Sequence, residues 1–526
     1  MAFGRYAAKA YGAKHAEKPL DPSLATEGKK PRGRKGFVPY NNGTIVPKGS
    51  AYVAQPNLSA AQRAIIADVC QVGNGSLLVD AKAGSSKTTV LIESMYRLAQ
   101  LFPNLTVAYF IFAKRNQVEA ESKAPASVNC QTAHSLGLRA LKSVLGKIEV
   151  DTRGDKAEAI ARGLFGGEDE KIEARYNFVQ ALGLAKAYLC ETAEDVAKFV
   201  EKHEVDLLED TAQEFATKIL EGLRLSAVQN RIVDFNDMVW LPVRLNLTLP
   251  QFDIVMADEA QDLSPARIQL ILRTVKPNGK LISVGDDRQS IFSFTGSDAQ
   301  SLATIRGLSD AHVLPLNMTF RCGRKIVELC QEIVPEYEAH ESNPEGLVAE
   351  KSEEDMLRDV QPGDAILSRV NAPLVGYALQ LLKAGRKANI LGRDLGKGML
   401  YMLKRSGASD VNAFLTWLTE WANIECERKL KKNQDTTQIK DKMSCMESFC
   451  EGTNDLAEVR KRINDIFSDS EEGNFVILSS VHRFKGLERS TVWVLANTLK
   501  RGKNTEEDNI AYVSFSRARN CLFLVK

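Results

Sequence analysis

The stretch LLVDAKAGSSKTTVLI, residues 77–92, decides the fold. Residues 77–80 predict a short buried strand, and an apolar helix is expected to begin near Lys87. A tight loop of small residues between a strand and a helix turns backbone N–H groups toward one point, where an anion such as a triphosphate is stabilised. In such a loop Lys87 reaches the β- and γ-phosphates, and the hydroxyl of Thr88 binds Mg²⁺.

This loop departs at two positions from the strict pattern G-x-x-x-x-G-K-[ST]. Ala81 stands at the first glycine position, and Ser86 stands directly before the lysine. Taken alone, the loop therefore also fits a small-residue turn before an ordinary helix. If Ser86 adopts a glycine-like backbone angle, we expect strain or weaker nucleotide affinity. The nucleotide-binding candidates here are Ala83, Gly84, Ser85, Ser86, Lys87, Thr88 and Thr89.

A second stretch, FDIVMADEAQD at residues 252–262, ends an apolar strand in adjacent carboxylates. Asp258 can hold Mg²⁺ through water, and Glu259 can orient and deprotonate an attacking water. An acidic turn after a buried strand is common in α/β proteins, so this motif indicates little by itself. Together with the loop, it predicts a site for phosphoanhydride hydrolysis.

Short apolar strands alternate with helices along the chain, which predicts an α/β fold with parallel sheets. In a first unit, residues 51–315, strands are expected at 77–80, 107–112, 254–258 and 281–284. The run between His134 and Leu241 has no proline and is rich in Ala, Leu, Glu and Lys, so it predicts a helical insertion at about 138–229.

A second α/β unit is expected over residues 316–526. Its predicted strands lie at 365–368, 475–479, 491–495 and 521–525, and a charged helical insertion is expected at about 398–473. Nine cysteines, odd in number and scattered without a CxxC pair, predict neither a disulfide framework nor a zinc site. The N-terminus lacks the apolar core of a signal peptide, and no apolar run is long enough to span a bilayer.

The charge of the chain is unevenly distributed. The 69 basic and 67 acidic residues leave a net charge of +2, which argues against a uniformly basic nucleic-acid surface. Residues 1–50 hold ten Lys and Arg against three acidic residues, so this segment carries +7 and the remainder −5. Its Gly, Pro and Asn content predicts a flexible basic arm. The arm fits a phosphate-tracking tail, a nuclear import signal or a solubilising extension.

Further motifs bring in a family resemblance. Besides the two stretches above, the chain contains seven further motifs, which are in order NLSAAQRAI, IFAKRNQVEAE, TAHSLG, VGDDRQSIFSFTGSD, LNMTFRCGRKI, SSVHRFKGLERS and AYVSFSRARNCLFLV. From about Asn57 onward the chain resembles superfamily 1 helicases of the UvrD/Rep/PcrA kind. DEAQDLSPA, FAKRN and TAHSLG are similar to the branch of the eukaryotic F-box DNA helicase and phage-encoded relatives. The resemblance implies two RecA-like parallel-sheet domains of the P-loop NTPase class, each with a mainly helical insertion.

The resemblance also implies roles around a nucleotide, with ATP and Mg²⁺ as the cofactors. Thr88 and Asp258 would hold the metal, and Lys87 and Glu259 would act in catalysis. Further residues are Gln62 on the adenine edge, Phe320 stacked on adenine in place of the usual tyrosine, Glu488 on the ribose, and the catalytic Gln289, Arg321 and Arg517 at the γ-phosphate. An inserted arginine finger contributes about 10³ to 10⁵ in rate.

A third set of residues would contact single-stranded DNA: Phe112, Thr132, His134, Phe292, Phe294, His482 and Lys485. Aromatic faces stack on bases with about 1–3 kcal/mol each and tolerate any sequence. Phe292 and Phe294 stand where the family often has tyrosine and tryptophan. Either phenylalanine fits a buried core position as well.

The resemblance therefore predicts an ATP-dependent single-stranded DNA translocase and DNA helicase, moving 3′ to 5′. The alternative is a nucleotide-gated DNA-binding, loading or filament-stripping factor with little unwinding, and RNA stays a lesser candidate substrate. Expected partners are single-stranded DNA and its junctions with duplex, together with a single-strand-binding protein or a replication or recombination factor. We expect a monomer without membrane contact, in the cytoplasm of a bacterial or phage-infected cell, or in the nucleus of a eukaryote.

Overall fold

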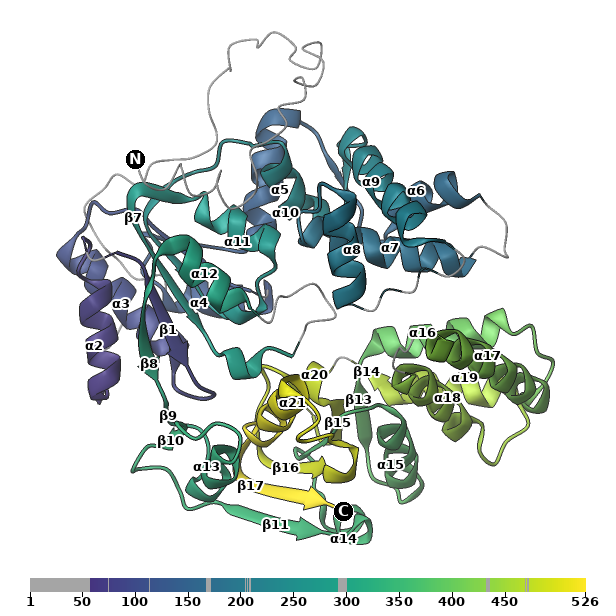
Figure 1. Cartoon of the computed structure of the whole chain (residues 1–526). Helices are drawn as coiled ribbons and strands as arrows, with labels where there is room; N and C mark the ends of the chain where they lie inside the picture. Colours follow the sequence, from purple (N-terminus) through teal and green to yellow (C-terminus); the bar gives the residue numbers. More distant parts are fainter. Residues whose placement is uncertain are drawn as a thin grey trace.

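Two parallel sheets, one after the other along the chain, organise the molecule (Figure 1). The computed structural model describes residues 57–526 apart from 74, 113, 167–171, 204, 206, 208, 209, 292–299, 432–435, 469, 471 and 472. The predicted arm at residues 1–50 and the candidates Phe292 and Phe294 lie outside the described residues. The predicted class, an α/β fold with two RecA-like sheets and helical insertions, is confirmed.

All neighbouring strands of the first sheet pair in parallel. Its order is β3 (Val128–Gln131), β2 (Val107–Phe110), β6 (Phe252–Ala257), β7 (Val275–Gly285), β1 (Leu77–Ala81) and β8 (His312–Leu316). The four predicted strands are present with shifted ends. β7 begins before its predicted start. Its first residues, VKPNGK, are mostly polar, so no apolar run indicated a strand there.

Alternation along the strands gives this sheet two cores. On β1, Leu77 and Val79 pack with α2 (Ala60–Val69) and α3 (Lys87–Leu101), whereas Leu78 joins a second cluster on the other face. That second cluster contains residues of α5 (Ala133–Leu145), α10 (Phe235–Arg244), α11 (Pro265–Leu272) and α12 (Ser301–Ser309). Another helix, α4 (Lys114–Lys123), follows β2.

The first helical insertion lies between α5 and α10. Between them lie α6 (Asp155–Phe165), α7 (Ile172–Ala187), α8 (Ala193–Lys202), α9 (Ala212–Val228) and the paired strands β4 (Glu149–Val150) and β5 (Ile232–Val233). Buried charges join its helices: Lys156 Nζ lies 2.6 Å from Asp237, and Lys186 Nζ lies 2.8 Å from the same carboxylate.

The second sheet has seven strands, and all its neighbours are again parallel. Its order is β11 (Leu347–Lys351), β17 (Ala518–Val525), β16 (Arg489–Leu495), β12 (Ala365–Ser368), β15 (Val476–Ser480), β13 (Ala388–Leu391) and β14 (Phe467–Ser468). A small pair, β9 (Met318–Thr319) with β10 (Glu338–Ala339), follows the crossing from the first sheet. We call residues 57–316 the first unit and residues 318–526 the second unit.

Helices of the second unit flank its sheet and form the second insertion. The flanking ones are α13 (Arg324–Gln331), α14 (Glu353–Asp359), α15 (Ala372–Lys383), α20 (Val481–Phe484) and α21 (Thr505–Phe515). The insertion consists of α16 (Arg393–Arg405), α17 (Val411–Lys431), α18 (Thr437–Cys450) and α19 (Leu456–Ile466). Asp441 of α18 accepts hydrogen bonds from the backbone N–H groups of Asn371 and Ala372, so it caps the start of α15 and ties the insertion to the sheet.

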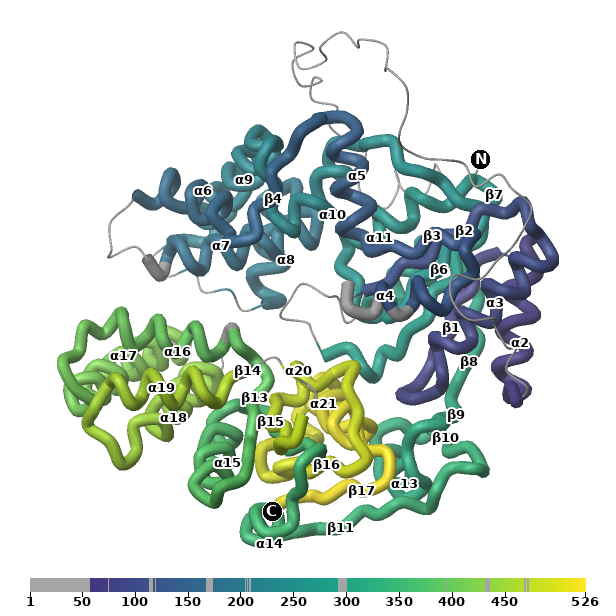
Figure 2. Tube along the Cα trace, turned by 180° about the vertical axis from the view of Figure 1, so that it is seen from behind, coloured from purple at the N-terminus to yellow at the C-terminus, as the bar shows by residue number. Residues whose placement is uncertain are grey.

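The two units lie against each other, the first above the second in Figure 1. Both helical insertions lie on the same side of the molecule, as Figure 2 shows from behind. Within the described ranges, no helix has the length and apolar content needed to cross a membrane. The nine cysteines are all free thiols, as their scattered spacing predicts.

Candidate active site

The predicted phosphate loop, residues 82–86, joins β1 to α3. Its backbone is left-handed at Gly84 (φ 68°) and Ser86 (φ 65°). Ser86 therefore adopts the glycine-like angle considered from sequence, at a cost of about 1–2 kcal/mol for a residue with a Cβ. Gly84 has no room for a side chain, because a Cβ there would lie 2.5 Å from Thr319 Oγ1 of the second unit.

Lys87 opens α3 and faces the carboxylates that follow β6. Its Nζ lies 3.2 Å from Glu259 Oε2; the Lys87 side chain is largely buried and that of Glu259 is partly buried. Burial lowers the pKa of Lys87, but the charges of Glu259, Asp286 and Asp258 outweigh it, so the pKa lies above its ordinary value. Lys87 is therefore a permanent cation at the mouth of the loop.

The adjacent carboxylates have opposite electrostatic settings. Asp258 accepts hydrogen bonds from Tyr109 Oη (2.8 Å) and Thr88 Oγ1 (3.4 Å), and its pKa is raised by burial and by the charge of Glu259. Burial also opposes ionisation of Glu259, but Lys87 and other cations lower its pKa below the ordinary value. Gln261 Nε2 donates to Glu259 at 2.6 Å and orients it. Glu259 is the carboxylate held ionised, as a general base requires.

The residues present fit a triphosphate with a divalent cation. Within the described part of the chain, Ser85 Oγ in the loop is buried and has no hydrogen-bond partner. A phosphate oxygen is the group that would satisfy such a hydroxyl in an anion-binding loop. The exposed Thr88 offers a hydroxyl and the adjacent Asp258 a carboxylate, and the two together fit Mg²⁺.

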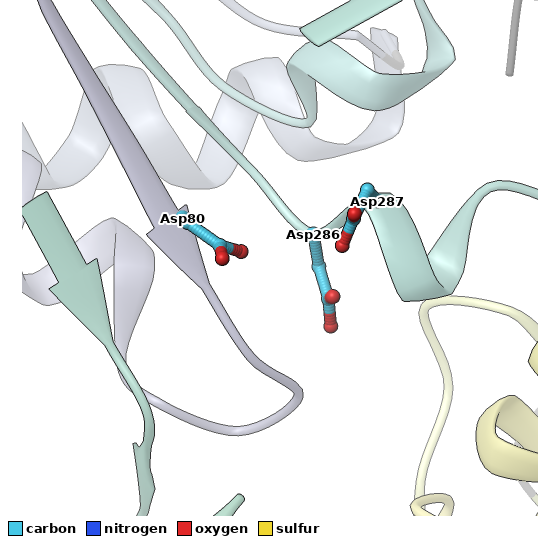
Figure 3. Close-up of side chains that lie close together, drawn as sticks. All are labelled: Asp80, Asp286 and Asp287. Atoms are coloured by element: carbon cyan, nitrogen blue, oxygen red, sulfur yellow. The ribbon is translucent and has the colours of Figure 1, made fainter. Parts of the chain in front are cut away.

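A second acidic group lies beside the loop. Carboxylate oxygens of Asp80 at the end of β1 and of Asp286 and Asp287 after β7 lie within 4.8 Å of one another (Figure 3). Lys82 supplies a positive charge beside them: its Nζ lies 2.9 Å from Asp80 and 3.6 Å from Asp287. Burial lowers the pKa of Lys82, but Asp286 and Asp80 raise it above the ordinary value. A side chain of the loop thus offsets part of the negative charge of the cluster.

Residues of the second unit reach the same site. Arg517 is 2% exposed and donates through Nη2 to Gln289 Oε1 at 3.2 Å, while Gln289 Nε2 donates to Asp286 at 2.7 Å. Burial and the neighbouring charge of Arg321 lower the pKa of Arg517 to about 10, so it stays a cation at neutral pH. The structure therefore brings Gln289 and Arg517 together across the two units.

Arg321 and Glu488 form an ion pair with each other, and Arg519 Nε also donates to Glu488 at 2.9 Å. Arg321 Nη1 donates to the Ser516 carbonyl at 3.4 Å. Burial raises the pKa of Glu488, but the charges of Arg321 and Arg519 lower it below the ordinary value. Arg321 and Glu488, both predicted to contact the nucleotide, are therefore paired with other protein groups in this structure.

The two predicted adenine contacts have different surroundings. Phe320 lies beside the loop, where its N–H donates to the Gly84 carbonyl at 2.9 Å, and its half-buried ring lies 4.7 Å from that of His340. Gln62 is buried, and its Oε1 accepts from the Ser59 N–H at 2.8 Å in a capping box at the start of α2. Helix capping accounts for the carbonyl half of the Gln62 side chain.

Three candidate nucleic-acid contacts of the first unit lie at the ends of β2 and β3. Phe112 and His134 line a cavity of about 290 Å³, in which the Arg267 guanidinium lies 5.0 Å from the Phe112 ring centroid. Burial and the charge of Arg267 lower the pKa of His134 to about 4, so its imidazole is neutral at pH 7. Thr132 is buried as the N-cap of α5, where its hydroxyl accepts from the Ser135 N–H.

The second-unit candidates follow β15: His482 lies on α20, and Lys485 directly follows this helix. Burial, followed by the charges of Arg369 and Lys485, lowers the pKa of His482 to about 3. Lys485 is buried at the junction of the two units, where it contacts Asp262 at 2.7 Å and the Gln289 carbonyl at 2.5 Å. Lys485 thus lies among first-unit groups rather than on an open surface.

Several site residues were not predicted from the sequence: Lys82, Tyr109, Asp262, Arg267, Asp286, Asp287, Glu336, Tyr337 and Tyr512. Most of them lie within or beside the quoted motifs, so proximity to a motif was the available signal. Tyr337 lies outside every motif, and only the fold brings it to the loop.

Comparison with known proteins agrees with this geometry. Residues 58–307 match the model of the UvrD/REP helicase N-terminal domain. The chain is 23% identical to the F-box DNA helicase 1 of Gallus gallus over 504 residues, which cover 84% of this chain and 46% of that protein. It is also 23% identical to the F-box DNA helicase protein 1 of Schizosaccharomyces pombe, covering 89% of this chain and 58% of the relative.

A bacterial relative matches a shorter stretch. The ATP-dependent DNA helicase PcrA of Staphylococcus epidermidis is 24% identical over 313 residues, which cover 54% of this chain and 41% of that protein. The chain thus spans about half the length of the curated relatives it matches. The predicted resemblance to the UvrD, Rep and PcrA helicases and to the F-box branch is confirmed by these matches.

Proposed function

We propose that this chain, whose residues 58–307 match the UvrD/REP helicase N-terminal domain, is an ATP-dependent single-stranded DNA translocase and DNA helicase. One observation carries the proposal: Lys87, paired with Glu259 of the first unit, is linked through Asp286 to Gln289 and so to Arg517 from the second unit. A phosphoryl-transfer site needs a cation at the phosphates, a base for water and a cation inserted from outside. Lys87, Glu259 and Arg517 supply all three.

In this proposal the residues of the chain divide the work of hydrolysis. Lys87 holds the phosphates, and the ionised Glu259, oriented by Gln261, accepts a proton from the attacking water. Thr88 and Asp258 are the residues that would hold Mg²⁺, which neutralises phosphate charge when bound. Arg517 and Arg321 stabilise charge that develops at the γ-phosphate, so release of the phosphate would loosen the contact between the units.

Movement along DNA would use the face that contains Phe112 and His134. Their cavity also contains Asp262, which is paired with Lys485 of the second unit. A change in the distance between the units therefore acts directly on the wall of this cavity. Breaking a base-pair step costs on average about 1.4 kcal/mol of stacking, which a hydrolysis cycle can supply. The 3′ to 5′ direction rests on the family resemblance alone.

Two assays on the purified chain test the proposal. Steady-state ATP hydrolysis is expected to rise on addition of single-stranded DNA, and duplexes with a 3′ single-stranded tail are expected to be unwound. Duplexes with only a 5′ tail serve as the matched control for direction. Hydrolysis that is absent with and without DNA would refute the enzymatic proposal, and unwinding from the 5′ tail alone would reverse the direction.

A second candidate function is a nucleotide-gated DNA-binding, loading or filament-stripping factor. The left-handed Ser86 in the phosphate loop favours it, because a residue with a Cβ at this angle is strained, and we expect a strained loop to bind nucleotide more weakly and to turn over more slowly. DNA binding that changes with nucleotide while unwinding is absent would support this alternative. Displacement of a protein filament from single-stranded DNA, measured beside unwinding, separates stripping from helicase activity.

A further inference from the structure

Two tyrosines of the second unit hold one peptide segment of the phosphate loop. Tyr512 Oη accepts a hydrogen bond from the Ala83 N–H at 2.9 Å, and Tyr337 Oη donates to the Ala83 carbonyl at 2.8 Å. Both tyrosines are completely buried, and their rings meet edge to face with centroids 5.6 Å apart. The backbone of Ala83 is thus bound on both sides by the other unit.

The side chain of Ala83 is also part of this contact. Ala83 is 1% exposed and belongs to the apolar core of the second unit, together with residues such as Cys322 and Ile326. The next carbonyl, that of Gly84, accepts a hydrogen bond from the Phe320 N–H. The centre of the loop is therefore inserted into the second unit rather than exposed in the space between the units.

A charged contact reinforces this arrangement. Glu336 lies 3.2 Å from the buried ammonium of Lys82, directly before Ala83 in the loop, and Glu336 directly precedes Tyr337. Two consecutive residues of the second unit therefore bind two consecutive residues of the loop. One loop of the second unit, between α13 and β10, thus contacts both residues 82 and 83 of the phosphate loop.

The other tyrosine connects the loop to the catalytic arginine. Tyr512 lies on α21, and Arg517 follows the C-terminal end of the same helix. Tyr512 Oη also lies 3.3 Å from Asp286, the carboxylate that accepts from Gln289. A shift of α21 would therefore move the Ala83 contact and the Arg517 contact together.

We propose that Tyr337 and Tyr512 are positioning residues that hold the phosphate loop in its nucleotide-binding shape when the second unit is docked on it. This inference rests on the proposed function, in which the loop binds ATP. An anion-binding loop must direct its N–H groups at the phosphates. A loop that is already fixed loses less conformational freedom when the ligand binds, so its affinity is higher.

The test removes one hydroxyl at a time with Tyr337→Phe and Tyr512→Phe in the full chain. The probes are a fluorescent ADP analogue for the dissociation constant and ATP for kcat and KM. A net hydrogen bond contributes about 0.5–1.5 kcal/mol, so each variant should raise Kd and KM about two- to tenfold. We expect kcat to fall less than twofold, because neither tyrosine touches the reacting atoms.

Tyr377→Phe is the matched control. This tyrosine is a buried residue of α15 in the same unit, and its hydroxyl bonds to Glu353 instead of the loop. Loss of the Tyr377 hydroxyl should leave the ADP dissociation constant unchanged. The double variant Tyr337→Phe/Tyr512→Phe should weaken ADP binding by less than the product of the single effects, because both hydroxyls hold one residue.

The outcomes separate the two levels of the proposal. Wild-type chain that binds no ADP analogue would overturn the proposed function and the positioning role together. If wild type binds and both phenylalanine variants bind equally well, only the positioning role is overturned. A purely structural role predicts lower thermal stability with unchanged Kd, so melting curves of all variants are recorded beside the titrations.

Discussion

Lys485 of the second unit and Asp262 of the first form a buried ion pair, with Nζ 2.7 and 2.8 Å from the two carboxylate oxygens. The Lys485 side chain is 7% exposed and that of Asp262 is 3% exposed. Asp262 ends the turn that begins with Asp258 and Glu259, and it also lines the cavity of Phe112 and His134. This pair therefore joins the second unit to the proposed hydrolytic site and to the candidate DNA face at once.

Removal of one partner of this pair should destabilise the junction strongly. Lys485→Met leaves the Asp262 charge buried and unpaired, which costs about 3–5 kcal/mol for such a group. We expect the free energy of unfolding in urea to fall by about 3 kcal/mol. The double variant Lys485→Met/Asp262→Leu should recover part of this loss, because no charge stays buried.

The control for the Lys485 and Asp262 variants is the exposed ion pair of Lys325 and Glu345, whose N···O distance is 2.9 Å. Lys325→Met should leave the free energy of unfolding unchanged within error, because solvent screens this pair. If Lys485→Met behaved like Lys325→Met, the ion pair would not hold the units together.

Glycine in place of Ser86 should relieve strain in the phosphate loop. The φ of 65° costs a residue with a Cβ about 1–2 kcal/mol, and glycine lacks this cost but loses more chain entropy on folding. We expect Ser86→Gly to raise the free energy of unfolding by about 1 kcal/mol and to tighten ADP binding.

A matched control for Ser86→Gly is Asp310→Gly, since Asp310 has a φ of 49° at the end of α12. That variant should gain stability without any change in ADP affinity. Equal ADP affinity of Ser86→Gly and wild type would show that the strain at Ser86 does not affect the nucleotide site.

Loss of the base or of the loop cation should stop DNA-stimulated hydrolysis. General-base catalysis contributes about 10² to 10⁴ in rate, so Glu259→Gln is expected to lower kcat at least 100-fold while ADP still binds. Lys87→Ala should lose both nucleotide affinity and turnover. The exposed Lys198 and Glu194, an ion pair on α8, provide control substitutions of the same types. Normal turnover in Glu259→Gln would show that Glu259 is not the general base.

Two neutral histidines should make stability depend on pH. The pKa of His134 is about 4 and that of His482 about 3, whereas an unfolded chain keeps a value near 6.5. The unfolded state therefore binds more protons below pH 6.5, so this stability is complete above that pH and is lost as pH falls toward 4 and 3. In urea titrations, the free energy of unfolding of His482→Gln should fall less steeply than that of wild type between pH 6.5 and 4. Identical slopes in variant and wild type would contradict the assignment.

Local pattern predicted much of the fold. Strands of continuous apolar residues, such as residues 365–368, were found with the same limits, because a buried parallel strand has a compositional signal of its own. The start of β7 and the strands β3, β8, β11, β13 and β14 were missed. These segments are polar, mixed or only two to five residues long, so their local pattern is weak, and pairing with a neighbour makes them strands.

By itself, the sequence determined the strand, loop and helix around Lys87 and the carboxylates after β6, because each depends on residues adjacent in the chain. Tertiary structure alone decided which partners these motifs meet. Lys485 and Asp262 are 223 residues apart, and Tyr512 and Ala83 are 429 residues apart. Residue type and spacing carry no information on such pairs, because the docking of two separately formed sheets determines which buried groups must satisfy each other's hydrogen bonds and charges.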